Sequence, residues 1–174
     1  MLVKLTKAQM AQAHQGASAR GLIMRAAQIA NQQVSKVQTS VDVELLGMKA
    51  ELAVATVFQI DHNPMVLGVD NGTDLFLDDI GVDVKSSFHQ NGQMLFRSSG
   101  HFRAEVCVLA TATDKPDVMK VVGWLHRNEF LAKAKPSPNK KFTGIAVPQE
   151  QLRNLSTLWA AVTERRLSRG IYEA

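Results

Sequence analysis

The stretch that decides the fold is residues 72–87, GTDLFLDDIGVDVKSS. Two short runs of β-forming residues flank the dipeptide Asp78-Asp79, a pattern that predicts a β-hairpin with these two residues as its loop. The register that follows places three residues of the first strand opposite three of the second: Leu77 with Ile80, Leu75 with Val82, and Asp74 with Asp83.

Side chains alternate between the two faces of a strand, so this hairpin has one apolar and one charged face. The apolar face carries five aliphatic residues, Leu75, Leu77, Ile80, Val82 and Val84. The charged face carries Asp74, Asp83 and Lys85. Because directly opposed like charges destabilise a strand pair, the two carboxylates favour a bound cation. The alternative is a solvated hairpin in which Lys85 is a surface charge paired with Asp83.

A helix is predicted from Thr39 to Phe58, and Thr39 and Asp42 have the spacing of a capping box at its start. Helical periodicity turns Glu44 and Glu51 toward the side that should pack inward. Buried carboxylates are rare unless they are paired or bind a metal. Glu51 lies in mid-helix and is therefore a candidate ligand, whereas Glu44 in the first turns could instead reach solvent or favour the helix dipole.

The remaining elements predict an α/β or α+β sandwich around a mixed sheet. Residues 5–38 contain no acidic residue and are expected to form two helices separated by Gly16 and Gly21. Further strands are expected at 94–97, 104–113, 118–125 and 142–147, and further helices at 128–134 and from Pro148 onward. We expect an N-terminal helical extension, residues 1–38, before a single globular unit, residues 39–174.

Composition places the chain among ordinary globular proteins: it has 174 residues, 45% of them hydrophobic, and no apolar run long enough to span a bilayer. Its one cysteine, Cys107, lies in an apolar run, which predicts a core residue and no internal disulfide, as in cytoplasmic proteins. A net charge of +4 and a pI of about 9.4 are compatible with a polyanionic partner.

The expected carboxylates would make an oxygen-rich site of the kind that Mg²⁺ or Mn²⁺ prefers. A metal ion that activates water, beside an ammonium group that offsets charge on phosphorus, suits the hydrolysis of a phosphodiester.

Asp74, followed by Asp83-Val84-Lys85, resembles the signature of the PD-(D/E)XK nuclease superfamily, which includes restriction-endonuclease-like and Holliday-junction-resolvase-like proteins. The helix segment 47–55, GMKAELAVA, resembles the first core helix of that superfamily, and the likeness in element order covers residues 41–147. The chain departs from the pattern in having Thr73 where a proline is common and Asp83 where glutamate is more usual. The resemblance implies a restriction-endonuclease-like core, a mixed β-sheet flanked by helices, and a Mg²⁺-dependent or Mn²⁺-dependent endodeoxyribonuclease.

By that resemblance, Asp74, Asp83 and the Val84 carbonyl would ligate the metal, Glu51 would bind it through water or complete a second site, and Lys85 would position the attacking water. Possible auxiliary residues are Glu44 on the helix, and Ser86 and Ser87, which either contact phosphate or cap the end of the strand. DNA contacts are expected from one of two patches of cations: Lys133, Lys135, Lys140 and Lys141, or Arg97 and Arg103.

A small chain with no evident target-recognition domain favours recognition of DNA structure, as in junction, repair or phage DNA processing. Cutting both strands would require a homodimer, because one active site cuts one strand. Two other functions remain open from the sequence. One is a non-catalytic nucleic-acid-binding protein that retains the nuclease fold, and the other is a partner-binding protein that uses the N-terminal helices.

Overall fold

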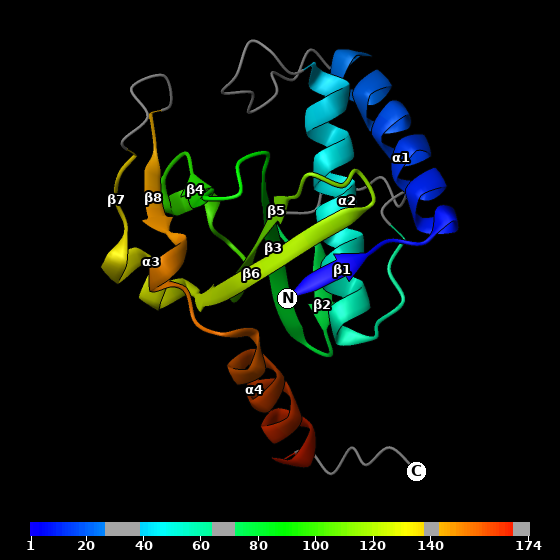
Figure 1. Ribbon diagram of the computed structural model, residues 1–174. Helices are drawn as coiled ribbons and strands as arrows, with labels where there is room; N and C mark the ends of the chain where they lie inside the picture. The colour runs from blue at the N-terminus through cyan, green and yellow to red at the C-terminus, as the bar shows by residue number, and fades with distance from the viewer. Residues whose placement is uncertain (27–38, 64–71, 138–142, 169–174) are drawn as a thin grey trace.

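The computed structural model describes residues 1–26, 39–63, 72–137 and 143–168, and these form an α+β protein with four helices, a curled five-stranded sheet and a small three-stranded sheet (Figure 1). The predicted class is thus confirmed at this level. Within the described residues, no helix has the length and apolar character that crossing a bilayer requires.

The large sheet is mixed: β3 and β5 are parallel, and its other neighbouring strands are antiparallel. Its strand order is β1 (Leu2–Lys4), β6 (Val118–His126), β5 (Val106–Ala112), β3 (Ile80–Ser87) and β2 (Leu75–Leu77). The small antiparallel sheet has the order β4 (Gln93–Phe96), β8 (Ile145–Pro148) and β7 (Lys135–Pro136). The four helices are α1 (Lys7–Ala26), α2 (Ser40–Phe58), α3 (Arg127–Lys133) and α4 (Leu155–Ser168).

The hairpin β2–β3 has the predicted register, with Leu75 opposite Val82 and Leu77 opposite Ile80. Its loop begins at Asp78, whose φ of 57° lies in the left-handed region that aspartate tolerates better than most residues. All five aliphatic residues of the predicted apolar face are buried in the main core, between the large sheet and α2. The alternation of apolar and polar residues along the two strands therefore predicted correctly which face of the hairpin is buried.

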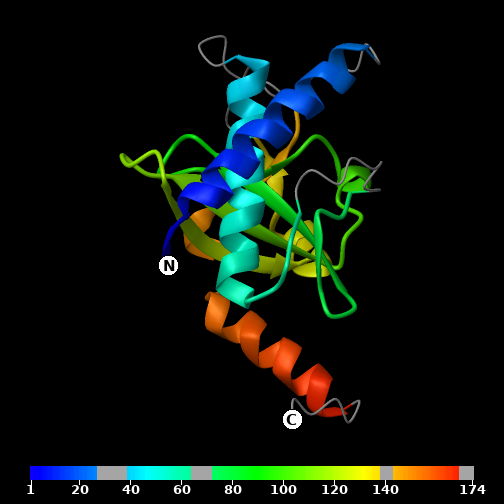
Figure 2. The same cartoon turned by 90° about the vertical axis from the view of Figure 1, so that its right-hand side faces the viewer.

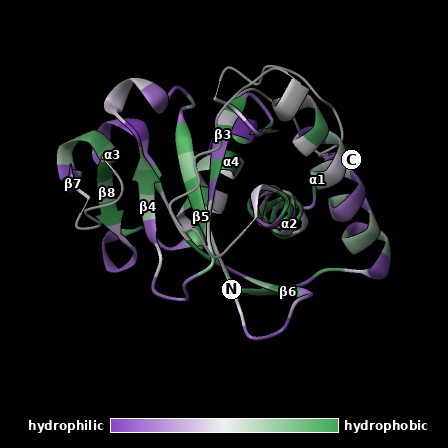
Figure 3. Cartoon of the chain, turned by 90° about the horizontal axis from the view of Figure 1, so that it is seen from above, coloured by the Kyte–Doolittle hydropathy of each residue, from purple (hydrophilic) through white to green (hydrophobic). Residues whose placement is uncertain are grey.

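The large sheet curls around α2, and α1 packs against the outer side of that helix (Figure 3). The capping box at the start of α2 is present, because Thr39 Oγ1 accepts the Asp42 N–H (N···O 3.2 Å) and the Asp42 carboxylate accepts the Thr39 N–H (2.8 Å). The small sheet lies on the other face of β3 and β5, over a second core that includes Cys107, which is buried as predicted.

The prediction of two N-terminal helices separated by Gly16 and Gly21 was wrong, because α1 runs through both glycines. Both are buried, and a Cβ added at Gly21 would lie 3.8 Å from the Val41 side chain. The small residues bring α1 close to α2, so tertiary packing offsets their low helix propensity. Strand β1, which pairs with β6, was not predicted from the sequence.

The helix predicted from Pro148 was also wrong at its start, because Pro148 ends β8 and α4 begins only at Leu155. Pro148 lies opposite Gln93 at the end of the small sheet, so cross-strand pairing and a 3₁₀ turn at Gln149–Gln151 displace the helix. The other predicted strands and the helix at 128–134 are present with ends shifted by up to three residues, and position 142 lies outside the described residues.

Helix α4 extends past the end of α2 (Figure 2). Arginines in its last turn contact the hairpin loop. Arg166 Nε donates to the Asp78 carboxylate (N···O 2.8 Å), and Arg165 contacts Glu105 at 3.1 Å. These ion pairs connect residues about 60 to 90 positions apart, because Arg165 is separated from Glu105 by 60 and Arg166 from Asp78 by 88.

Candidate active site

The charged face of β3 carries Asp83 and Lys85, which lie opposite the α2 side of the sheet. Asp83 is only 2% exposed, and its carboxylate accepts a hydrogen bond from Lys85 Nζ. The Lys85 ammonium also lies over the ring of Phe96 in β4, 4.6 Å from the ring centroid. A salt bridge and a cation–π contact therefore hold Lys85 between the two sheets.

Asp74 stands immediately before β2 and is fixed by two backbone contacts. Its N–H donates to the Val82 carbonyl (N···O 2.8 Å), and its Oδ2 accepts the Val84 N–H at 2.6 Å. Both partners flank Asp83 in the sequence, so Asp74 lies beside the Asp83 segment of β3. The recorded pairing of the hairpin begins at Leu75, so the predicted pair of Asp74 with Asp83 stays a prediction, although Asp74 bonds to the residues on either side of Asp83.

Burial raises the pKa of Asp74 well above its usual value, and the negative charges of Glu51 and Asp83 raise it further. The Lys85 ammonium and the hydrogen bond from Val84 N–H oppose that rise. Burial is the largest single influence on the pKa of Lys85 and lowers it, but the negative charges of Asp83, Cys107 and Asp74 and the hydrogen bond to Asp83 together outweigh burial, so the net shift is upward. Lys85 consequently stays protonated, whereas the Asp74 carboxyl group favours its protonated form more than an ordinary aspartate does.

Glu51 reaches this site from α2, which packs on the apolar face of the hairpin rather than on its charged face. Its side chain is almost wholly buried and lies between two basic side chains, with Arg20 Nη1 at 3.5 Å from Oε1 and His62 Nε2 at 3.0 Å from Oε2. Glu51 contacts Arg20 and His62, and it acts on Asp74 through the repulsion of its negative charge, which raises the pKa of Asp74.

Glu44 shares the inward side of α2 with Glu51, as the helical period predicts, and lies 3.8 Å from Arg20. Burial raises the pKa of Glu44, the charge of Arg20 lowers it, and the charge of Glu51 raises it again. Arg20 therefore serves two inward carboxylates at once and joins α1 to the site.

Sequence reasoning missed Arg20 and His62 as members of this site. The signal was present, because two inward glutamates require a buried countercharge or a metal. The sequence did not indicate which cation supplies it, since Arg20 lies 31 positions before Glu51 on a separate helix and His62 lies in the segment after α2.

A divalent cation at this site would draw on Asp74 and Asp83, the one or two carboxylates that Mg²⁺ commonly takes from a protein. The crowding of negative charge at Asp74 fits such a cation. Among the described residues, no three His, Cys, Asp or Glu side chains are grouped so as to hold a metal ion. Asp83 is instead paired with Lys85, and Glu51 with Arg20 and His62.

The two serines after Lys85 have different positions. Ser87 Oγ accepts the His89 N–H at 3.1 Å, which agrees with the interpretation that it caps the end of the strand. Ser86 is half-buried and alternates to the face opposite Lys85.

The two predicted patches of cations lie in different places. Arg103 is exposed and lies next to Gly72, which stands two positions before Asp74 in the chain. A Cβ added at Gly72 would be 3.4 Å from the Arg103 Cβ. Arg97 is exposed directly after β4. In the other patch, Lys133 donates to the Gln151 carbonyl and Lys135 is exposed in β7, while positions 140 and 141 lie outside the described residues.

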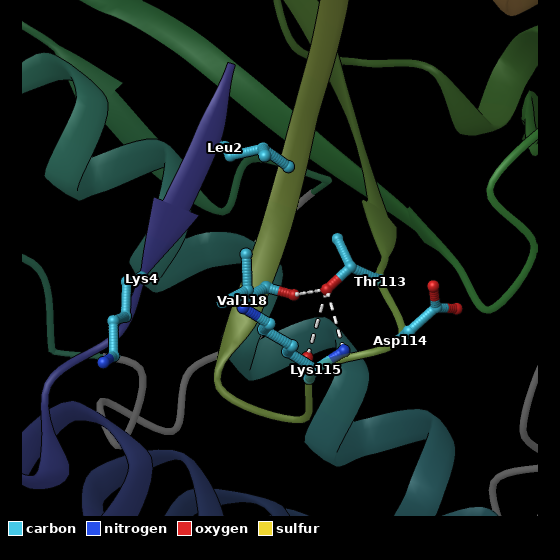
Figure 4. A pocket seen from close by; sticks show the side chains of 6 residues that line it. All are labelled: Leu2, Lys4, Thr113, Asp114, Lys115 and Val118. Atoms are coloured by element: carbon cyan, nitrogen blue, oxygen red, sulfur yellow. Dashed lines mark hydrogen bonds between the residues drawn. The ribbon is translucent and has the colours of Figure 1, made fainter.

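A separate open pocket of about 390 Å³ lies at the opposite edge of the large sheet (Figure 4). Its lining residues come from β1 and the turn between β5 and β6: Leu2, Lys4, Thr113, Asp114, Lys115 and Val118. Thr113 Oγ1 donates to the Val118 carbonyl (2.9 Å) and accepts the Lys115 N–H (3.2 Å), which stabilises the turn. The pocket contains none of the residues of the charged face.

Comparison of the chain with protein-family models, with curated proteins and with solved structures finds no match.

Proposed function

We propose that this protein is a metal-dependent endodeoxyribonuclease of the PD-(D/E)XK type. The observation that carries the proposal is the charged face of the hairpin, where Asp74, Asp83 and Lys85 are held together by backbone register. Asp74 is tied to Val84 N–H at 2.6 Å, and Lys85 contacts Asp83 directly. Two carboxyl groups lie beside an ammonium group, and the pKa of one of the two, Asp74, is raised. This arrangement is unfavourable for stability but suits phosphoryl chemistry.

In this proposal Asp74, Asp83 and the Val84 carbonyl hold Mg²⁺ or Mn²⁺, and Glu51 contributes through water. A bound divalent cation would polarise the scissile phosphate and lower the pKa of a water molecule. Lys85 releases Asp83, orients the attacking water and offsets the charge that develops on the phosphate oxygens. The Phe96 ring beneath the ammonium keeps Lys85 on the charged face while Asp83 changes partner.

The test is nicking of supercoiled plasmid DNA and of branched DNA in the presence of Mg²⁺ or Mn²⁺. We expect cleavage by the wild-type chain, its loss on chelation, and a decrease of about 100-fold or more in Asp83→Asn and Lys85→Gln, as for loss of a group that stabilises transition-state charge. Asp114→Asn and Lys115→Ala are the matched controls, since both residues are exposed at the opposite edge of the sheet, and both variants should keep wild-type activity.

Folding of the variants must be separated from chemistry, because Asp83 and Lys85 are partners. Thermal unfolding identifies any variant that is not folded, and Lys85→Gln retains a hydrogen-bond donor toward Asp83. Full cleavage by folded Asp83→Asn and Lys85→Gln proteins would refute the proposal.

A non-catalytic nucleic-acid-binding protein is the second candidate. The pairing of Asp83 with Lys85 and of Glu51 with Arg20 and His62 favours it, since two of the three candidate carboxylate ligands already have basic partners. This function predicts salt-dependent DNA binding that metal ions do not strengthen. Thermal stabilisation of the wild-type chain by Mn²⁺, and its absence in Asp74→Asn, would instead support the nuclease.

A further inference from the structure

The edge strand β2 exposes an aromatic side chain between two buried ones. Phe76 is 60% exposed, whereas Leu75 and Leu77 on either side of it are 4% and 1% exposed. Alternation therefore points Phe76 to the face opposite the main core, which is the face of Asp74 and Asp83. Single exposed apolar residues are common on protein surfaces, so a role for Phe76 follows only from its neighbours.

The residue opposite Phe76 leaves its ring uncovered. Phe76 pairs with Gly81, and a Cβ added at Gly81 would lie 3.7 Å from the Phe76 Cε1 atom and 3.3 Å from the Thr73 side chain. Most side chains at this position would cover the ring, because cross-strand neighbours on one face normally pack together. A glycine within a strand is common where a ligand approaches the backbone closely.

The surroundings of Phe76 on this face are polar. Asp74 and Asp83 lie next along the two strands, and Thr73 and Gly81 adjoin it. Arg103 stands beside Gly72, two positions before Asp74. A flat base can stack on an isolated ring, and of the charged neighbours Arg103, unlike the two carboxylates, suits the anionic backbone of a nucleotide.

We propose that Phe76 is a stacking platform for an unpaired base, so that the substrate is DNA with single-stranded nucleotides beside the cleavage point. Arg103 holds the backbone of the same strand at the other side of Asp74. The inference rests on the proposed function for the direction of the strand across the site. A base inside an intact duplex cannot present its face to a side chain, and this restricts stacking to single strands, flaps, gaps and junctions.

The experiment measures binding without cleavage, by fluorescence anisotropy in EDTA and low salt, of a labelled oligothymidine of about 12 nucleotides and of a blunt duplex of the same length. Phe76→Ala should weaken binding of the single strand by about 5- to 100-fold, as loss of one stacked base does. Phe76→Trp should retain the affinity, and Phe76→Leu should lose it, because the interaction requires a flat ring. Duplex affinity should change less than about twofold in all three.

Two further variants complete the test. Leu22→Ala removes an equally exposed apolar side chain from α1 and should leave both affinities unchanged. Arg103→Ala should weaken binding of both probes and reduce the salt dependence by about one counterion.

Single-strand affinity within twofold of wild type in Phe76→Ala would overturn the inference, as would an equal loss on the blunt duplex. A change in oligomeric state on size exclusion without a change in binding would overturn it too, because Phe76 would then contact a second copy. The two hypotheses can fail separately. A protein that binds single-stranded DNA through Phe76 but cleaves no DNA would refute only the nuclease function. Cleavage that does not depend on Phe76 would refute only base stacking on Phe76.

Discussion

Replacement of Asp74 by asparagine should stabilise the protein, although substitution of a partly buried group usually destabilises. Asparagine keeps an oxygen that accepts the Val84 N–H, which Asp74 now binds at 2.6 Å, and removes the negative charge that Glu51 and Asp83 oppose. Opposed like charges on neighbouring strands cost up to about 1 kcal/mol. We therefore expect a gain of about 1 kcal/mol, which corresponds to about 2–4 °C in Tm for a domain of this size.

The pH dependence gives a second, independent criterion. Because the folded-state pKa of Asp74 is raised, the folded chain binds this proton more tightly than the unfolded chain. The stability that Asp74 contributes is therefore present at low pH and is lost as pH rises from about 4 through the raised pKa. The advantage of Asp74→Asn should be near zero at about pH 4, should grow as pH rises, and should level off above the raised pKa.

The assay is urea unfolding of wild type and Asp74→Asn at several pH values in EDTA, with Asp114→Asn as the exposed control. The control should stay within about 0.5 kcal/mol of wild type. An Asp74→Asn protein that is less stable than wild type at neutral pH, or an advantage that does not vary with pH, would refute the electrostatic reasoning. Replacement of a residue that is kept for function at a cost in stability raises the free energy of unfolding, whereas replacement of a residue kept for packing lowers it.

Three further substitutions test how the fold holds the site. Gly123→Ala should lower the free energy of unfolding by about 1–3 kcal/mol in urea titration, because the new Cβ would lie 2.5 Å from the Arg153 carbonyl oxygen; a neutral result would refute this close approach. Thr39→Ala should lower it by about 1 kcal/mol through loss of the cap on α2, and Thr39→Ser should restore most of that, as thermal unfolding can show. Arg20→Ala should lower the free energy of unfolding by about 1–3 kcal/mol because Glu51 stays buried without its arginine partner. The loss should shrink in an Arg20→Ala, Glu51→Gln double variant, and equal losses would show that Arg20 acts without Glu51.

Local sequence determined the hairpin and its two faces. The alternation between Leu75 and Val84 has one register that buries all the aliphatic residues, and Asp74, just before the paired residues, bonds to Val82 and Val84 on either side of Asp83. The start of α2 was equally local, since a capping box closes within four residues. These features follow from neighbours in the chain, so no tertiary information was needed to predict them.

Tertiary structure alone decided which groups surround the carboxylates. Arg20, from a helix that sequence propensity would have divided at its glycines, pairs with Glu51 because α1 packs closely on α2. The Phe96 ring under Lys85 and the Arg103 side chain beside Gly72 come from the segment that connects β3 to β5 by way of the small sheet. Such contacts join residues far apart in the chain, and their geometry depends on how whole elements pack. Residue pattern therefore determined the chemistry available on the hairpin, whereas the curl of the sheet around α2 decided its electrostatic partners.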